Sequence, residues 1–140
     1  MTASNATYMV LRSSATVRVA GATQQVLAGL IVDRRRPVEI GIDLINLPGP
    51  AWWVSRHLLD VGLVGRAGDM DVIVEPAWPL HVSVLLRASQ PGDRDCTVPL
   101  LRSEVRRALT LSWQIVDRDT EQEWIERSVN AAIARCLVGS

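Results

Sequence analysis

The sequence has no lysine and no phenylalanine, and all fifteen of its basic residues are arginine. Fifteen acidic residues balance them, so the formal net charge of the 140-residue chain is zero. A chain without net charge lacks the long-range field that draws a protein toward polyanions, which argues against nucleic acid as a partner. A GC-rich genome explains the arginine bias more simply than a binding site does.

Cysteine is also scarce. Cys96 and Cys136 lie far apart, without CxxC spacing or the density of a secreted, disulfide-stapled domain, and we expect both to be reduced and buried. The first residues lack the positive segment and apolar run of a signal peptide, and no run of about 18 apolar residues could span a membrane. These absences and the length predict a cytoplasmic protein with one domain over residues 1–140 and no direct membrane insertion.

The scarcity of histidine restricts catalytic chemistry, because His57 and His81 are the only two. Residues 52–63, WWVSRHLLDVGL, bring Ser55, His57 and Asp60 close together in sequence. A triad needs the serine oxygen and the carboxylate on opposite nitrogens of one imidazole. Residues two apart on a strand start about 6.5 Å apart, and no oxyanion hole or G-x-S-x-G motif accompanies them. The sequence therefore predicts no catalytic residue and no enzyme activity.

Metal and cofactor motifs are missing too. No cysteine and histidine ligands occur at zinc spacing, and Asp69 and Asp71 lack the further oxygen ligands of a calcium loop. Gly62, Gly65 and Gly68 recur every third residue, but they do not form a phosphate-binding motif after a strand. We therefore expect neither a metal nor a cofactor.

Alternating apolar residues predict strands in the first two-thirds of the chain. Residues 38–44 and 80–88 each have one apolar and one polar face. Residues 26–32 are apolar on both faces, which fits a central strand or a strand whose second face meets another subunit. Weaker strands are expected at residues 9–19, 51–55, 71–75 and 96–101. Pro99 favours an edge position for the last of these.

The segment DRRRP, residues 33–37, joins two of these strands as a hairpin whose tip carries Arg34, Arg35 and Arg36. Such a charge run is a solvated turn or a binding patch, and the solvated turn is the commoner case.

The last third is helical. Apolar residues at three- and four-residue spacing predict a helix over residues 102–116. After a break at DRDT, Thr120 and Glu123 have the spacing of a capping box, so a second helix should follow. Its apolar stripe consists of Trp124, Ile125, Val129, Ala132, Ile133, Cys136 and Leu137. Strands followed by helices indicate an α+β fold.

Three segments, in order, resemble the SsgA/SsgB-like sporulation and cell-division regulators of actinobacteria. WWVSRHLLDVGL is similar to their W-x-x-[AS]-R-[DE]-L-L-x-x-G-L segment, although His57 stands where the family usually has an acid. VLAGLIVDRRRPVEI is similar to P-A-G-L-x-Y-D-x-x-x-P-Y-x-V, and GDMDVIVEP to G-D-V-x-V-x-P. The residues of this shared frame are Gly29, Asp33, Pro37, Leu58, Leu59, Gly62 and Leu63.

The resemblance implies a curved antiparallel sheet of about six or seven strands, similar to the whirly fold, with two C-terminal helices. It implies a homotrimeric, non-enzymatic scaffold of sporulation septation. Such a scaffold helps to recruit the tubulin-like division GTPase, together with a septum-localising partner or paralogue. The residues expected to contact partners are Arg34, Arg35, Arg36, Trp52, Arg56 and His57.

Arg56 also has a structural interpretation, because its planar five-donor fork suits holding a carboxylate or loop carbonyls. We expect residues 56–61 to form a short helical turn, packed down by Leu58, Leu59 and Leu63. Gly62 would end this turn with a positive φ.

The alternative function is a whirly-like single-stranded nucleic-acid-binding protein. It would use Arg34–Arg36 and exposed tryptophans, the residue types that pair with phosphates and stack on bases. A whirly-like fold does not by itself carry that function, and the neutral charge argues against it.

Overall fold

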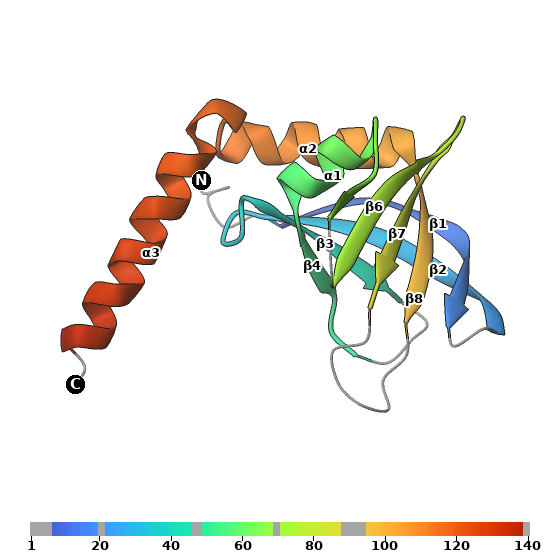
Figure 1. Ribbon diagram of the computed structural model, residues 1–140, viewed down its shortest axis with the longest axis horizontal. Helices are drawn as coiled ribbons and strands as arrows, with labels where there is room; N and C mark the ends of the chain where they lie inside the picture. The colour runs from blue at the N-terminus through green and yellow to red at the C-terminus, as the bar shows by residue number, and fades with distance from the viewer. Residues whose placement is uncertain (1–6, 20–21, 46–48, 69–70, 88–94, 139–140) are drawn as a thin grey trace.

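The computed structural model describes residues 7–19, 22–45, 49–68, 71–87 and 95–138. One antiparallel sheet forms the body of the molecule, and two helices lie across one end of it (Figure 1). The strands are β1 (Thr7–Val19), β2 (Ala22–Asp33), β3 (Glu39–Leu44), β4 (Trp52–Ser55), β5 (Ala67–Gly68), β6 (Val72–Ala77), β7 (His81–Leu86) and β8 (Cys96–Leu101). The helices are α1 (Arg56–Gly62), α2 (Arg102–Ile115), the short 3-10 helix η2 (Arg118–Thr120) and α3 (Glu121–Val138).

The strand order is β4-β3-β2-β1-β8-β7-β6-β5, and every described neighbouring pair is antiparallel. This confirms the predicted α+β fold with two C-terminal helices. Among the described residues the sheet has eight strands instead of six or seven, because the two residues of β5 add a short strand beside β6. β2 lies in the interior of the sheet, as one of its two interpretations required.

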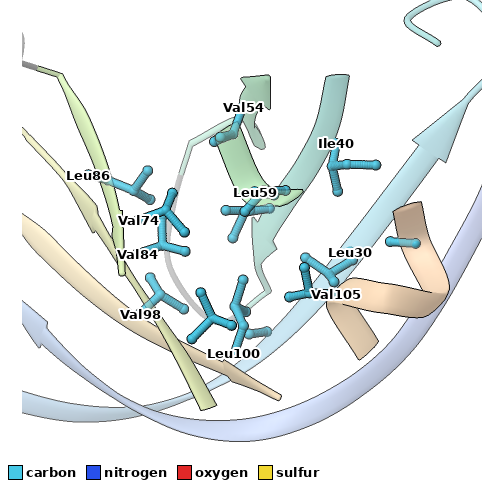
Figure 2. Packing of buried hydrophobic residues seen from close by; sticks show 14 of the residues in the cluster. Leu30, Ile40, Val54, Leu59, Val74, Val84, Leu86, Val98, Leu100 and Val105 are labelled. Atoms are coloured by element: carbon cyan, nitrogen blue, oxygen red, sulfur yellow. The ribbon is translucent and has the colours of Figure 1, made fainter. Parts of the chain in front are cut away.

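The core lies inside the curve of the sheet. Side chains of β6, β7 and β8 face those of β2 and β3 across it, and Leu59 of α1 lies between the two groups (Figure 2). Val105 and Leu109 of α2 also belong to this cluster. The alternating burial of β7 matches the period-two pattern of its sequence, because successive side chains of a strand point to opposite faces.

The edge position expected for β8 is wrong. β8 lies between β1 and β7, and Pro99 is paired with Ser83 of β7. In the described register, however, β1 reaches only as far along β8 as Thr97. Pro99 therefore tolerates an interior strand, because its missing N–H interrupts no pairing with β1.

One expectation about the C-terminal third is also wrong, namely that both cysteines are buried. Cys96 is buried, but Cys136 is exposed on α3. The apolar stripe of α3 is exposed over most of its length, so it does not join the core. At the break before α3, Asp117 accepts the capping hydrogen bond of η2 from the Asp119 N–H, at 2.9 Å. The Thr120 hydroxyl instead donates to the Asp117 carbonyl.

Gly62 closes α1 for a different reason from the one expected. It is the last residue of the helix, and the positive φ angles among the described glycines belong to Gly49 and Gly68. A Cβ on Gly62 would lie 2.2 Å from Cγ1 of Val74. Glycine is therefore needed here for close packing of α1 against β6, not for backbone conformation.

Replacing Gly62 with alanine should lower the free energy of unfolding by about 1–3 kcal/mol, because the added methyl group overlaps Val74. Gly65→Ala is the matched control, since nothing lies within 4 Å of the Cβ position there. Urea denaturation compares the two variants with the unmodified chain. Equal stability of both variants would show that α1 can move away from β6 without cost.

Candidate functional site

Ser55, His57 and Asp60 do not form a catalytic arrangement. The Ser55 hydroxyl accepts a hydrogen bond from the Leu58 N–H and caps the start of α1. Asp60 pairs with Arg118 at 2.5 Å, and His57 is exposed on the helix surface. In the described part of the chain, no hydrogen bond joins the three side chains. Ser55 and Asp60 therefore have structural roles, whereas His57 is exposed and has no side-chain hydrogen bond to either of them.

Arg56 is the most unusual residue of the segment, because its side chain is charged and only 1% exposed. Its Nε donates to the carboxylate of Glu121 at the start of α3. Its Nη1 donates to the carbonyl oxygens of Pro37, at 3.3 Å, and Ser112, at 2.9 Å. Its Nη2 donates to the carbonyl of Asp117, at 3.3 Å. The guanidinium thus holds one carboxylate and three carbonyls, as expected of a brace, and its burial leaves it out of reach of a partner.

A second ion pair strengthens the same corner of the molecule. Arg118 of η2 pairs with Asp60 of α1 and places its guanidinium 4.2 Å from the ring centroid of Trp113 on α2. Such stacking over an aromatic face is favourable, because the cation meets the negative face of the ring. The two arginines together fix where α3 leaves the body of the protein.

The arginine-rich hairpin tip is largely paired within itself. Arg35 donates to the Asp33 carboxylate through its backbone N–H, at 2.9 Å, and through its side chain, at 3.2 and 2.9 Å. Arg36 pairs with Glu39 at 3.1 Å. Arg34 is half-buried, and its Nε has no hydrogen-bond partner in the described chain. The hydrogen bonds from Arg35 hold the pKa of Asp33 below its ordinary value of 3.8.

Trp53 is a residue of this region that the sequence did not single out. It lies opposite Gly41, whose missing side chain leaves room for the indole ring, and the Arg36 guanidinium lies 4.4 Å from the ring centroid. Trp52, which was singled out, is half-buried against the core. The feature that could have identified Trp53 is its cross-strand contact with Gly41. That contact can be recognised only when the register between β3 and β4 is known.

The described partner candidates do come close together at one end of the sheet. The Arg56 N–H donates to the Val38 carbonyl at 3.0 Å, so α1 starts directly beside the hairpin. Arg35, Arg36 and His57 are exposed there. We call Arg35, Arg36, Trp53 and His57 the hairpin–α1 surface.

The arrangement of tryptophans does not favour stacking on bases. Arg36 lies over Trp53, Arg118 lies over Trp113, and Arg102 lies 4.0 Å from the ring centroid of Trp78. One face of each of these rings is therefore already covered by an arginine of the same chain. Trp78 is largely exposed, but it lies in the β6–β7 turn, away from the hairpin–α1 surface.

A hollow of about 280 Å³ lies between α1 and α2. Its floor is apolar, and its rim carries charged and polar side chains. The lining residues are Asp60, Leu63, Arg106, Leu109, Thr110 and Trp113. We call this hollow the α1–α2 groove.

Comparison with known proteins identifies the family of this chain. A family model described as Streptomyces sporulation and cell division protein, SsgA, matches residues 26–121. The chain belongs to the SsgA family. The matched segment includes the hairpin, α1 and α2, and it ends at Glu121, the residue that binds Arg56.

Two solved structures resemble this SsgA-family chain. One is from work on mutations in SsgB that correlate with longitudinal cell division during sporulation of Streptomyces coelicolor. It is 23% identical with a TM-score of 0.61, over 85% of this chain and 95% of that chain. The other is an SsgA-like sporulation-specific cell division protein from Thermobifida fusca YX-ER1. It is 20% identical with a TM-score of 0.65, over 96% of this chain and 98% of that chain. At these identities the likeness shows the fold. No curated protein matches the sequence.

Within the residues that the structure describes, no cluster of three or more histidine, cysteine or acidic side chains could hold a metal ion. None of the described helices is long and apolar enough to cross a membrane.

Replacing Arg56 with lysine should lower the free energy of unfolding by about 3–5 kcal/mol, because one ammonium group cannot reach a carboxylate and three separate carbonyls. The exposed Arg66 provides the control variant Arg66→Lys. Thermal and urea unfolding of both variants measure the effect. A melting curve of Arg56→Lys that overlays the control would contradict the brace.

Asp33 should make the free energy of unfolding depend on pH in the acidic range. Because its pKa is lower in the folded than in the unfolded chain, its contribution is fully present above about pH 4 and is lost as pH falls through the folded pKa. Urea denaturation of the unmodified chain and of Asp33→Asn over a pH series should therefore show a stability difference that shrinks in acid. Asp71→Asn, at an exposed position, is the matched control for loss of one carboxylate. A difference between Asp33→Asn and the unmodified chain that stays constant with pH would contradict the assignment.

Proposed function

We propose that the chain is a non-enzymatic regulator of sporulation-specific cell division, acting as one domain over residues 1–140. The observation that carries this proposal is the match to the SsgA family over residues 26–121. Its role is that of a cytoplasmic scaffold that is recruited to division septa and does not insert into the membrane. Its partners are the tubulin-like division GTPase and a septum-localising partner or paralogue, and it works as a homotrimer.

The physical character of the hairpin–α1 surface supports a scaffold. Hydrogen bonds from Arg56 to the carbonyls of Pro37 and Val38 hold the hairpin against α1. The exposed side chains of the hairpin–α1 surface therefore project from a fixed backbone. A rigid surface loses little conformational entropy when a partner binds. Arg36 and Trp53 combine a charge with an aromatic ring, and both residue types are enriched in protein interfaces.

The test of this proposal is binding to the division GTPase of the same host, by pull-down and by two-hybrid assay. We expect Arg36→Ala and His57→Ala each to weaken binding about tenfold, a loss of about 1.4 kcal/mol, because the minority of interface residues that contribute strongly exceed about 1 kcal/mol on truncation. Arg87→Ala is the control, because Arg87 is exposed at the end of β7 and distant from the hairpin.

Deletion of the gene supplies a second readout. We expect the deletion strain to show altered septation during sporulation, and the unmodified gene to restore it. Unaltered septation, together with no binding to the GTPase, would overturn the proposal.

A further inference from the structure

α3 leaves the body of the protein instead of packing on it (Figure 1). Its principal packing contact is with η2, and every side chain from Val129 to Leu137 is exposed. Most helix stability in proteins comes from packing of an apolar face, and the described distal half of α3 has no such packing on its own body. The apolar side chains in the distal half of α3 are therefore exposed to solvent.

The exposed residues form a stripe along one helix face. Val129, Ile133 and Leu137 are 51%, 52% and 73% exposed, and their four-residue spacing places them one above another. Glu126, three residues before Val129, lies on the flank of the same face. We call Val129, Ile133 and Leu137 the α3 stripe.

The α1–α2 groove has the complementary character. Leu63, Leu109 and Trp113 give it an apolar floor, and Arg106 stands exposed at its rim without an ion-pair partner in the described chain. Its volume of about 280 Å³ is slightly below the range of small-molecule sites. A hollow of this size and composition suits a few apolar side chains of a helix, with an acidic residue beside them.

The stripe of α3 is held away from the groove of its own chain. The pair between Arg56 and Glu121 fixes the first residue of α3, and the pair between Arg118 and Asp60 fixes the turn before it. Folding back would break both pairs and would expose the buried charge of Arg56, which is costly. The groove can therefore receive this stripe only from another molecule.

We propose that the α1–α2 groove of one copy binds the α3 stripe of a second copy, with Glu126 of the entering helix beside Arg106 of the groove. This inference rests on the self-association in the proposed function and names the surface that produces it. The contact is heterologous, because each copy offers a helix on one side and a groove on the other.

Sedimentation velocity and light scattering over a range of concentrations test the contact. We expect Ile133→Asp to weaken self-association at least tenfold, because it puts a charge in the middle of the stripe. Ala131→Asp puts the same charge on the opposite face of α3 and should leave association unchanged. Thr110→Arg should weaken association equally by filling the exposed mouth of the groove. Circular dichroism is the control that checks whether each variant has kept its helices.

A mixture of two defective copies gives the sharpest result. Ile133→Asp retains an intact groove and Thr110→Arg retains an intact stripe, so each alone should be monomeric while an equimolar mixture forms a one-to-one dimer. Arg106→Glu and Glu126→Arg should each weaken association, and the two combined in one chain should restore it.

Two outcomes would contradict the proposed contact, and they distinguish it from the proposed function. Oligomers that persist in both Ile133→Asp and Thr110→Arg would overturn this contact and leave the homotrimer standing. A chain that is monomeric at every concentration would overturn both the contact and the homotrimer. Binding of the division GTPase is measured separately, so its loss or retention bears on the scaffold alone.

Discussion

The arrangement of the elements depends on the buried guanidinium of Arg56. An arginine that is 1% exposed would destabilise the fold if it were unpaired, because a charge removed from water must regain its interactions inside the protein. It regains them from Pro37 in the hairpin, Ser112 in α2, Asp117 before η2 and Glu121 in α3. Four segments that are distant in sequence are therefore held to the start of α1 by one side chain.

This constraint explains how a small protein can present surfaces on two sides. The hairpin and α1 are joined by buried hydrogen bonds of Arg56, so the exposed residues beside them are held on a fixed backbone. The same network fixes the direction in which α3 departs, and the α3 stripe is exposed to solvent. The exposed apolar residues of α3 are thus ones that the core does not use, and exposed apolar surface of this kind is typical of interaction sites.

The chemistry of single residues was a better guide than their proximity in sequence. The planar fork of Arg56 predicted a brace on a carboxylate and carbonyls, and that is its role. Ser55 and Asp60 suggested a triad only because they are near His57, whereas the structure uses one as a helix cap and the other in an ion pair. The ligands of Arg56 could not be found from sequence, because Glu121 lies 65 residues away.

The sequence by itself predicted every described strand except β5, the helices, the α+β class and the resemblance to a family, because periodicity and spacing are local properties of the chain. Only the tertiary structure decided why Gly62 is a glycine, where Pro99 fits and whether α3 is covered. Each of those answers depends on a contact between distant segments: Val74 against α1, β1 beside β8, and the ion pairs that direct α3. A stripe read from sequence shows that a helix has an apolar face, but only the packed molecule shows whether that face lies inside it.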